Sequence, residues 1–456
     1  MTEPKMPRSN SHPAAGRRVV AIDVLRGLVI FFLIPDVYGG FSFYEMAKRE
    51  PDSPLWAALA GQMTHVDWSG VALWDMIMPV FVFLVGASLA LSVDRRRRAG
   101  ETPARLCAGA ALRSAALIVL GLAVLIQPTA TLFEVLMPYL VLATGLPWSR
   151  WLDRRAGSAN RLRTLALDLL VPAVVVAGAG VWIGLHTDRL GDYDLNQILV
   201  QLGLAYWPAF LLAGRGLRAP AFRALLILIV WGAAFMVYPP SAGIEPVGEV
   251  YRGVMAHWNN GTNVAAAFDR WWLNLLPRAV PHLPHPHGYH TLQFVPLVAQ
   301  MLAGVVVGRM IEAEPRHRSV ALRLALAGAA GLVLSGLLSL TLVPLVKSLW
   351  TPSWAIFSTS ICVLVLAALM LVTERPRRSW LGVWVVHSLA VLGSNAILLY
   401  VITIRDKWRL VLLWEGLLGE AMTSSRLRPV LTSVLVLASL WFMAWALDRA
   451  RIQLRI

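Results

Sequence analysis

A short segment around residue 70 carries the side chains best suited to acid–base chemistry. His65 lies just before an apolar run, and Asp75 follows it within that run. A histidine titrates near neutral pH and can take up a proton, as a general base must. A carboxylate at the start of a helix is stabilised by the helix N-terminus, but deep in lipid it is costly. The two residues therefore indicate either a catalytic pair or, equally well, an interfacial histidine and a helix anchor.

Two cations and one amide lie in or beside other apolar stretches. Arg26 is near the inner end of the first stretch and Lys347 near the outer end of a later one, so either could bind an anionic group such as a phosphate. The alternative is that both side chains simply extend to the membrane interface. Asn395 lies within a stretch, where an amide bonds a neighbouring helix as readily as a substrate.

Four histidines alternate with prolines in the segment from Pro281 to His290. Because the prolines impose an extended loop, we expect no metal site there. Cys107 and Cys362 are far apart and lie in apolar segments, which indicates neither a disulfide framework nor a thiolate metal site.

The elements that must position these residues are long apolar segments. The 456-residue chain is 57% hydrophobic and 15% charged, whereas soluble proteins carry about a quarter charged residues. We therefore expect an all-α polytopic membrane protein with about 12 transmembrane helices in one bundle. The apolar stretches lie near 23–44, 71–92, 105–126, 130–147, 163–185, 194–213, 220–239, 291–311, 321–345, 353–373, 380–402 and 429–449.

The distribution of basic residues predicts the orientation. The net charge is +15, but the basic residues lie in short runs between apolar stretches, which is typical of membrane-protein loops and not of a nucleic-acid binder. Alternating spans place most of these runs on one side. We therefore expect a cell inner (cytoplasmic) membrane protein with both termini in the cytoplasm.

The same reasoning divides the chain into a cytoplasmic tail over 1–18 and one membrane domain over 19–456. The tail lacks the apolar core of a signal peptide, so we expect the first span to be retained. A long extracytoplasmic loop is expected near 240–290 and a second at 403–428, where five basic residues make the assignment to the outside the weakest fit.

Several motifs occur in one order along most of the chain. The main one is a histidine, a tryptophan and a glycine, followed by a spaced aspartate, proline and phenylalanine, and its residues are His65, Trp68, Gly70, Asp75, Pro79 and Phe81. It resembles the signature of the transmembrane acyltransferases related to heparan-α-glucosaminide N-acetyltransferase. Other segments similar to that family's lie at 23–27, 263–270, 347–353 and 393–401. Asp36 departs from the family, which commonly places an asparagine there, and so does Glu134, where a Gln-Arg pair is usual.

The resemblance implies transfer of an acetyl group from acetyl-CoA, supplied from the cytoplasm, to an amino sugar or glycan on the extracytoplasmic side. It implies that His65 is the catalytic group and Asp75 its partner. His65 would act as a general base or as a transiently acetylated nucleophile. The residues expected to bind the acceptor are Asp36, Trp68, Asp269, Lys347 and Asn395, and those expected to bind acetyl-CoA are Arg26 and Lys347.

A proton-coupled transporter or flippase of a sugar-containing substrate is the main alternative, because carriers also place carboxylates and histidines among many spans. The two halves show no inverted sequence symmetry, which favours the enzyme. An inactive membrane scaffold of the same fold is a third interpretation. The acceptor, transfer to nitrogen or oxygen, the acyl chain length and homo-oligomerisation stay open.

Overall fold

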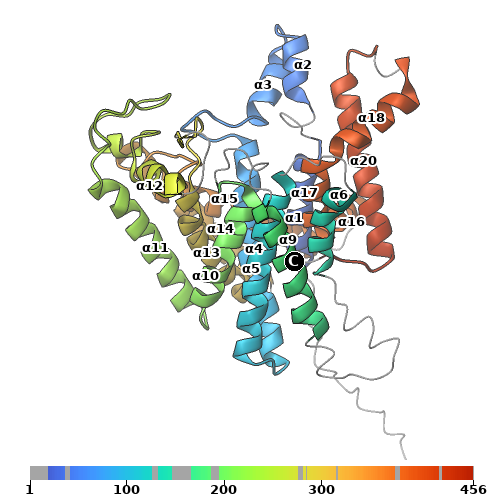
Figure 1. The fold of residues 1–456 in the computed structure, drawn as a ribbon, viewed down its shortest axis with the longest axis horizontal. Coiled ribbons are helices and arrows are strands. Elements are labelled where there is room, and N and C mark those ends of the chain that lie inside the picture. The colour runs from blue at the N-terminus through green and yellow to red at the C-terminus, as the bar shows by residue number, and fades with distance from the viewer. Residues whose placement is uncertain are drawn as a thin grey trace, which may run out of the picture.

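The structure is a computed structural model that describes residues 19–35, 42–125, 132–145, 166–185, 195–275, 281–283, 285–314, 317–374, 380–420 and 424–454. Within these residues the chain is helical, and its extended pairing is confined to a single bridge between Ser69 and Val346. The prediction of an all-α protein is confirmed. Figure 1 shows the longer helices gathered side by side in one bundle.

Eight helices in the described residues are long and apolar enough to cross a bilayer. They are α4 (Ile77–Arg98, preceded by the 3-10 turn η1, Leu73–Met76), α5 (Pro103–Leu125), α9 (Val171–Leu185, preceded by η2, Ala166–Leu170), α11 (Arg218–Val237), α13 (Phe294–Ala313, preceded by η6, Thr291–Gln293), α14 (His317–Thr341), α15 (Pro352–Glu374) and α20 (Arg428–Arg449). These lengths and compositions are those of a multi-pass membrane protein.

The expected number of about 12 spans is not confirmed. Three of the predicted stretches form shorter helices in the described residues, namely α1 (Val20–Leu33), α6 (Leu132–Ala143) and α10 (Ile198–Leu212). The stretch 380–402 is broken into α16 (Trp380–Ser394) and α17 (Ala396–Arg405), which meet at 74°. If this bent pair counts as one span, the described total is nine.

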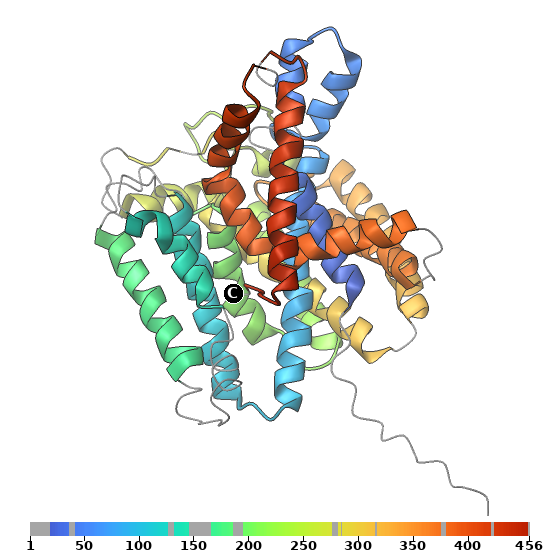
Figure 2. The ribbon, with the colours of Figure 1, turned by 90° about the vertical axis from the view of Figure 1, so that its right-hand side faces the viewer.

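The segment 403–428, expected to be a loop, instead contains the end of α17 and a helix, α18 (Lys407–Leu418). Leu410 and Val411 of α18 pack against the main hydrophobic core. Their partial burial favours the helix, because helical stability comes mostly from packing an apolar face. In Figure 2, α20 faces the viewer and α16 crosses it.

The centre of the bundle is the contact between α4 and α13. A side chain at Gly86 would lie 1.9 Å from the Met301 carbonyl oxygen, and one at Gly304 would lie 2.1 Å from that of Phe83. Only glycine permits so close an approach of two helix backbones, as small residues do in membrane bundles. This contact fixes α4, which begins beside the candidate site.

Residues 240–275, the first part of the expected long loop, fold into what we call the cap. It contains η4 (Gly253–Trp258) and α12 (Val264–Trp272), and the Trp258 ring stacks 4.5 Å from that of Phe235 on α11. Figure 1 shows α12 towards the end of the bundle beyond which α2 (Phe43–Arg49) and α3 (Pro54–Gln62) extend. We call this the cap end.

Candidate functional site

Two residues of one short segment and a third from a distant part of the sequence meet at the cap end of α4. The Nδ1 atom of His65 lies 2.7 Å from Oδ1 of Asp75. The Lys347 ammonium lies 3.1 Å from the same oxygen and 3.0 Å from His65 Nδ1. The structure therefore brings together His65, Asp75 and Lys347, which we call the triad.

The local backbone holds the Asp75 carboxylate in place. Asp75 lies in the 3-10 turn η1, and its Oδ2 accepts hydrogen bonds from the N–H groups of Ala72 at 3.3 Å and Val66 at 3.4 Å. The carboxylate also lies at the N-terminal end of the span, where a negative charge is favoured by the helix dipole. With both oxygens occupied, the carboxylate orients the His65 ring.

Lys347 is carried by a compact segment between α14 and α15. The Leu345 carbonyl accepts a hydrogen bond from the N–H of Gly70 at 3.1 Å, which joins this segment to the loop that contains His65. The Thr351 hydroxyl donates to the Pro344 carbonyl at 2.8 Å, and the Gln293 amide donates to the Lys347 carbonyl at 3.2 Å. These hydrogen bonds hold Lys347 next to the loop that contains His65.

The three members differ sharply in exposure. The His65 side chain is 46% exposed, whereas Asp75 is 1% and Lys347 is 7% exposed. Because His65 Nδ1 faces the buried carboxylate, Nε2 is the ring nitrogen that can meet a reactant. A proton that Nδ1 donates to Asp75 leaves Nε2 as a basic lone pair, whereas a hydrogen bond donated by Lys347 to Nδ1 would place the ring proton on Nε2.

The surroundings favour the neutral form of His65. Partial burial lowers the pKa of His65 below its ordinary value, and the positive charges of Lys347 and His287 lower it further, while Asp75 opposes this. Burial disfavours the charged imidazolium. A neutral imidazole is the form that can act as a base or a nucleophile.

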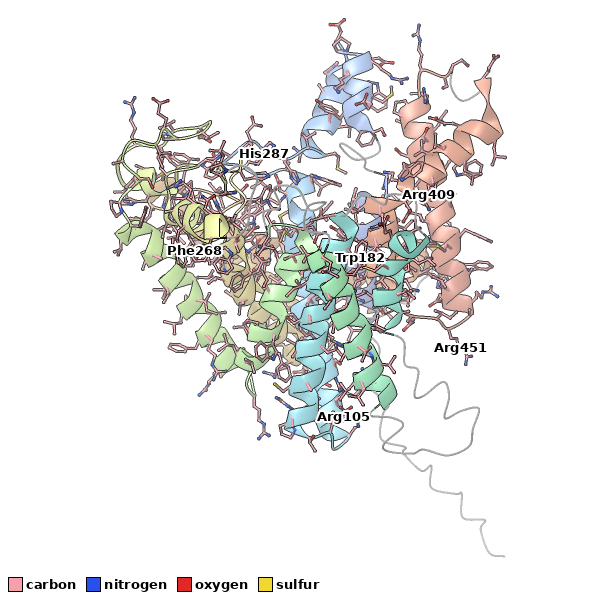
Figure 3. The ribbon with its side chains drawn as sticks, viewed as in Figure 1. Arg105, Trp182, Phe268, His287, Arg409 and Arg451 are labelled. Carbon is pink, nitrogen blue, oxygen red and sulfur yellow. The ribbon has the colours of Figure 1, made fainter. Side chains whose placement is uncertain are left out.

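The loop 285–290 lies over the triad. The Tyr289 ring centre is 5.9 Å from the Lys347 ammonium, and Asn260 of the cap donates to the Pro286 carbonyl at 2.8 Å. Gly288 has a φ of +66°, and a side chain there would come within 2.2 Å of the buried Trp68 ring. Figure 3 labels His287 of this loop near the cap end. The loop thus narrows the approach to His65.

A second histidine–aspartate pair, which the sequence did not indicate, lies where this loop meets η6. His290 Nδ1 is 3.3 Å from Oδ2 of Asp269, which also accepts the Thr291 N–H at 2.9 Å. Asp269, expected to bind the acceptor, has no direct contact with the triad and instead joins α12 to η6. Among the described residues, no three His, Cys, Asp or Glu side chains are grouped as metal ligands would be.

The remaining predicted residues lie elsewhere. Arg26 on α1 donates to Ser88 of α4 at 2.8 Å, about 20 Å along α4 from Asp75. Asn395, at the break between α16 and α17, donates to the Ile452 carbonyl at 3.1 Å and accepts the Leu454 N–H at 2.8 Å. Neither is brought to the triad. Asp36 lies outside the described residues.

Comparison with known proteins shows a weak similarity to a human enzyme. No family model matches the chain. The human heparan-alpha-glucosaminide N-acetyltransferase is 23% identical to it over 409 residues, which cover 84% of this chain and 52% of the human protein. The chain thus spans about half the length of that relative. The similarity supports a relationship to the family of that enzyme.

Proposed function

We propose that this chain is a membrane acyltransferase that moves an acetyl group from acetyl-CoA, supplied from the cytoplasm, to an amino sugar or glycan on the extracytoplasmic side of the inner membrane. The observation that supports the proposal best is the triad, in which a half-exposed histidine is backed by a buried carboxylate and a buried lysine. In this orientation the cap end faces outward.

His65 Nε2 takes the proton in the proposed reaction. As the acceptor amine attacks the thioester carbonyl, a C–N bond forms and the C–S bond breaks. The proton leaves the amine for Nε2 and passes from there to the departing thiolate. In the other route the imidazole attacks first and carries the acetyl group before the amine takes it. Both routes need the unprotonated Nε2.

Asp75 and Lys347 support His65 in either route. The carboxylate keeps the Nδ1 proton in place and stabilises the positive charge that develops on the ring, as a buried aspartate does in hydrolase triads. The Lys347 ammonium neutralises the buried carboxylate. A positive charge 3.0 Å from the ring also favours the negative charge that develops on the thioester oxygen.

The acceptor is proposed to bind beside the exposed edge of His65. The Trp74 ring centre is 6.2 Å from the His65 ring centre, and Tyr289 lies near Lys347, so aromatic faces border this position. Trp68 and Asp269 are buried and would act through the loops that they hold. Asp36 and Asn395 for the acceptor, and Arg26 and Lys347 for acetyl-CoA, stay as predictions.

The test measures label transfer from acetyl-CoA to a panel of amino sugars by detergent-purified protein. His65→Ala is expected to lower the rate by about 10²–10⁴-fold, the usual contribution of a general base. The matched control is His257→Ala, a cap histidine whose Nδ1 contacts the Tyr238 carbonyl. If folded wild-type protein transfers no label and binds no CoA, the proposal fails, and sugar-coupled proton uptake in proteoliposomes becomes the next test.

A further inference from the structure

A charged cavity lies at the end of α4 opposite the triad. Its volume is about 370 Å³, and it is bordered by the ends of α4 and α13 and by the turn between α10 and α11. Asp94 and Asp75 are separated by about 28 Å along the helix axis. Figure 3 labels Arg105, at the start of α5, at this same end. The charged residues of the cavity are Asp94, Arg97, Arg98, Arg215, Arg309 and Glu312.

A buried arginine fixes the shape of this cavity. Arg309 is 8% exposed, and its guanidinium donates to the carbonyls of Ala213, Gly214 and Gly216 at 3.0, 3.0 and 2.8 Å. Its Nε donates to Asp94 at 2.9 Å. Gly214 and Gly216 have φ values of +56° and +70°, which favour glycine. The two terminal nitrogens of Arg309 thus hold one turn in place, and its Nε joins that turn to α4.

The locked turn presents a single long side chain, Arg215, to the cavity. Arg215 makes no ion pair or hydrogen bond with any residue in the described part of the chain, whereas Arg98 pairs with Glu312. Arg97 uses one nitrogen on Asp94 and the Gly214 carbonyl. Four arginines here face two carboxylates, so the cavity has two positive charges in excess. This arrangement suits a phosphate group, which arginine binds with paired N–H donors.

An exposed apolar stripe runs along α11, the helix that follows the turn carrying Arg215. Phe222, Leu225 and Ile229 are 65%, 55% and 57% exposed and recur every three or four residues, so they form one stripe. The stripe starts four residues after the beginning of α11, directly beyond the turn that carries Arg215. In a bilayer, acyl chains would lie against this stripe.

We propose that the cavity binds the phosphate of an anionic phospholipid headgroup, with the acyl chains along α11. The excess positive charge of the cavity favours an anion. The exposed stripe on α11, the helix after the Arg215 turn, favours a lipid over a soluble phosphate compound. Basic pockets at the ends of membrane helices attract anionic headgroups in this way. The proposal does not depend on acyl transfer, because it concerns the opposite end of the bundle and has its own readout.

The test is native mass spectrometry of the purified protein in micelles that contain phosphatidylglycerol or phosphatidylcholine. We expect wild-type protein to retain phosphatidylglycerol preferentially, and Arg215→Gln to weaken this retention about fivefold. Arg318→Gln, an exposed arginine at the start of α14 that does not border the cavity, is the matched control and should retain the lipid as wild type does. Because Arg215 is exposed, the variant should keep the wild-type melting temperature.

Two outcomes would overturn the proposal. One is equal retention of phosphatidylglycerol by wild type and Arg215→Gln. The other is release of the lipid by inorganic phosphate or by CoA at the same concentration, which would assign the cavity to a soluble phosphate compound.

Discussion

The cap end of the molecule contains two histidine–aspartate pairs with different surroundings. In His65–Asp75 the histidine is 46% exposed, whereas in His290–Asp269 it is 2% exposed. Both carboxylates face the Nδ1 atom of their histidine, at 2.7 and 3.3 Å. The two pairs therefore share their internal geometry and differ in solvent access to the histidine, which a reactive Nε2 needs.

The two pairs also differ in the group that bonds the carboxylate from the other side. Asp75 is paired with the Lys347 ammonium at 3.1 Å, while Asp269 accepts the backbone N–H of Thr291 at 2.9 Å. A buried charge next to a half-exposed ring suits a site where charge develops during reaction. A buried carboxylate on a backbone amide suits the joining of two chain segments, here α12 and η6.

The largest effect on stability is expected from Asp75→Asn. The substitution keeps the shape of the side chain but leaves the Lys347 ammonium buried without its counter-charge. Breaking a buried pair in this way costs about 3–5 kcal/mol. Thermal unfolding of the detergent-purified variant measures it, with the neighbouring exposed Asp67→Asn as control. An unchanged melting temperature would show that the two groups are not paired in the folded protein.

A smaller loss of stability is expected from Asp269→Ala. The Thr291 N–H and the His290 ring then lose their acceptor, and an unsatisfied buried donor costs about 1–3 kcal/mol. Asp269→Asn keeps an oxygen for the Thr291 N–H and should lose less. Transfer per folded molecule should fall far less than in His65→Ala. A loss of transfer as large as that of His65→Ala at full stability would place Asp269 in the reaction.

The pH dependence of transfer tests the role of His65. The rate needs neutral His65, so kcat/KM should rise with pH through the pKa of His65, which burial holds below its ordinary value of 6.5. Lys347→Met removes a positive charge beside the ring and should move this rise to higher pH, measured on the folded protein. A profile that stays in place, or moves to lower pH, contradicts the assignment.

The smallest effect is expected from His287→Ala. The charge of protonated His287 also lowers the pKa of His65, although it is the weakest of the contributions. The rise in kcat/KM should therefore move slightly to higher pH, by less than in Lys347→Met. A larger shift than that of Lys347→Met would place His287 in direct contact with the base.

His65 and Asp75 were recognisable as candidates because both lie in one short segment at the start of a span, but their spacing could not show that they touch. Lys347 is 282 positions from His65, so no spacing pattern joins them. Its position near the end of a span and the family resemblance both indicated a site residue, but neither paired it with His65. The His290–Asp269 pair gave no usable signal. Its histidine lies in a proline-rich loop whose path depends on contacts with Trp68 and Asn260.

The helical fold was predictable from the apolar stretches, but the ends of the helices were not. Hydropathy is continuous over 380–402, yet the helix breaks at Asn395, whose side chain bonds the C-terminal segment. Similarly, 403–428 was wrongly expected to be a loop, because its basic residues conceal the apolar face that α18 packs on the core. Such tertiary contacts leave no local pattern.

The central claim is that His65 is the reactive histidine and that His290 has a structural role. Its most direct test compares acetyl transfer and melting temperature for His65→Ala and His290→Ala in the same preparation. We predict that His65→Ala loses transfer at an unchanged melting temperature, whereas His290→Ala lowers the melting temperature and retains transfer per folded molecule. Wild-type transfer by folded His65→Ala would contradict the account.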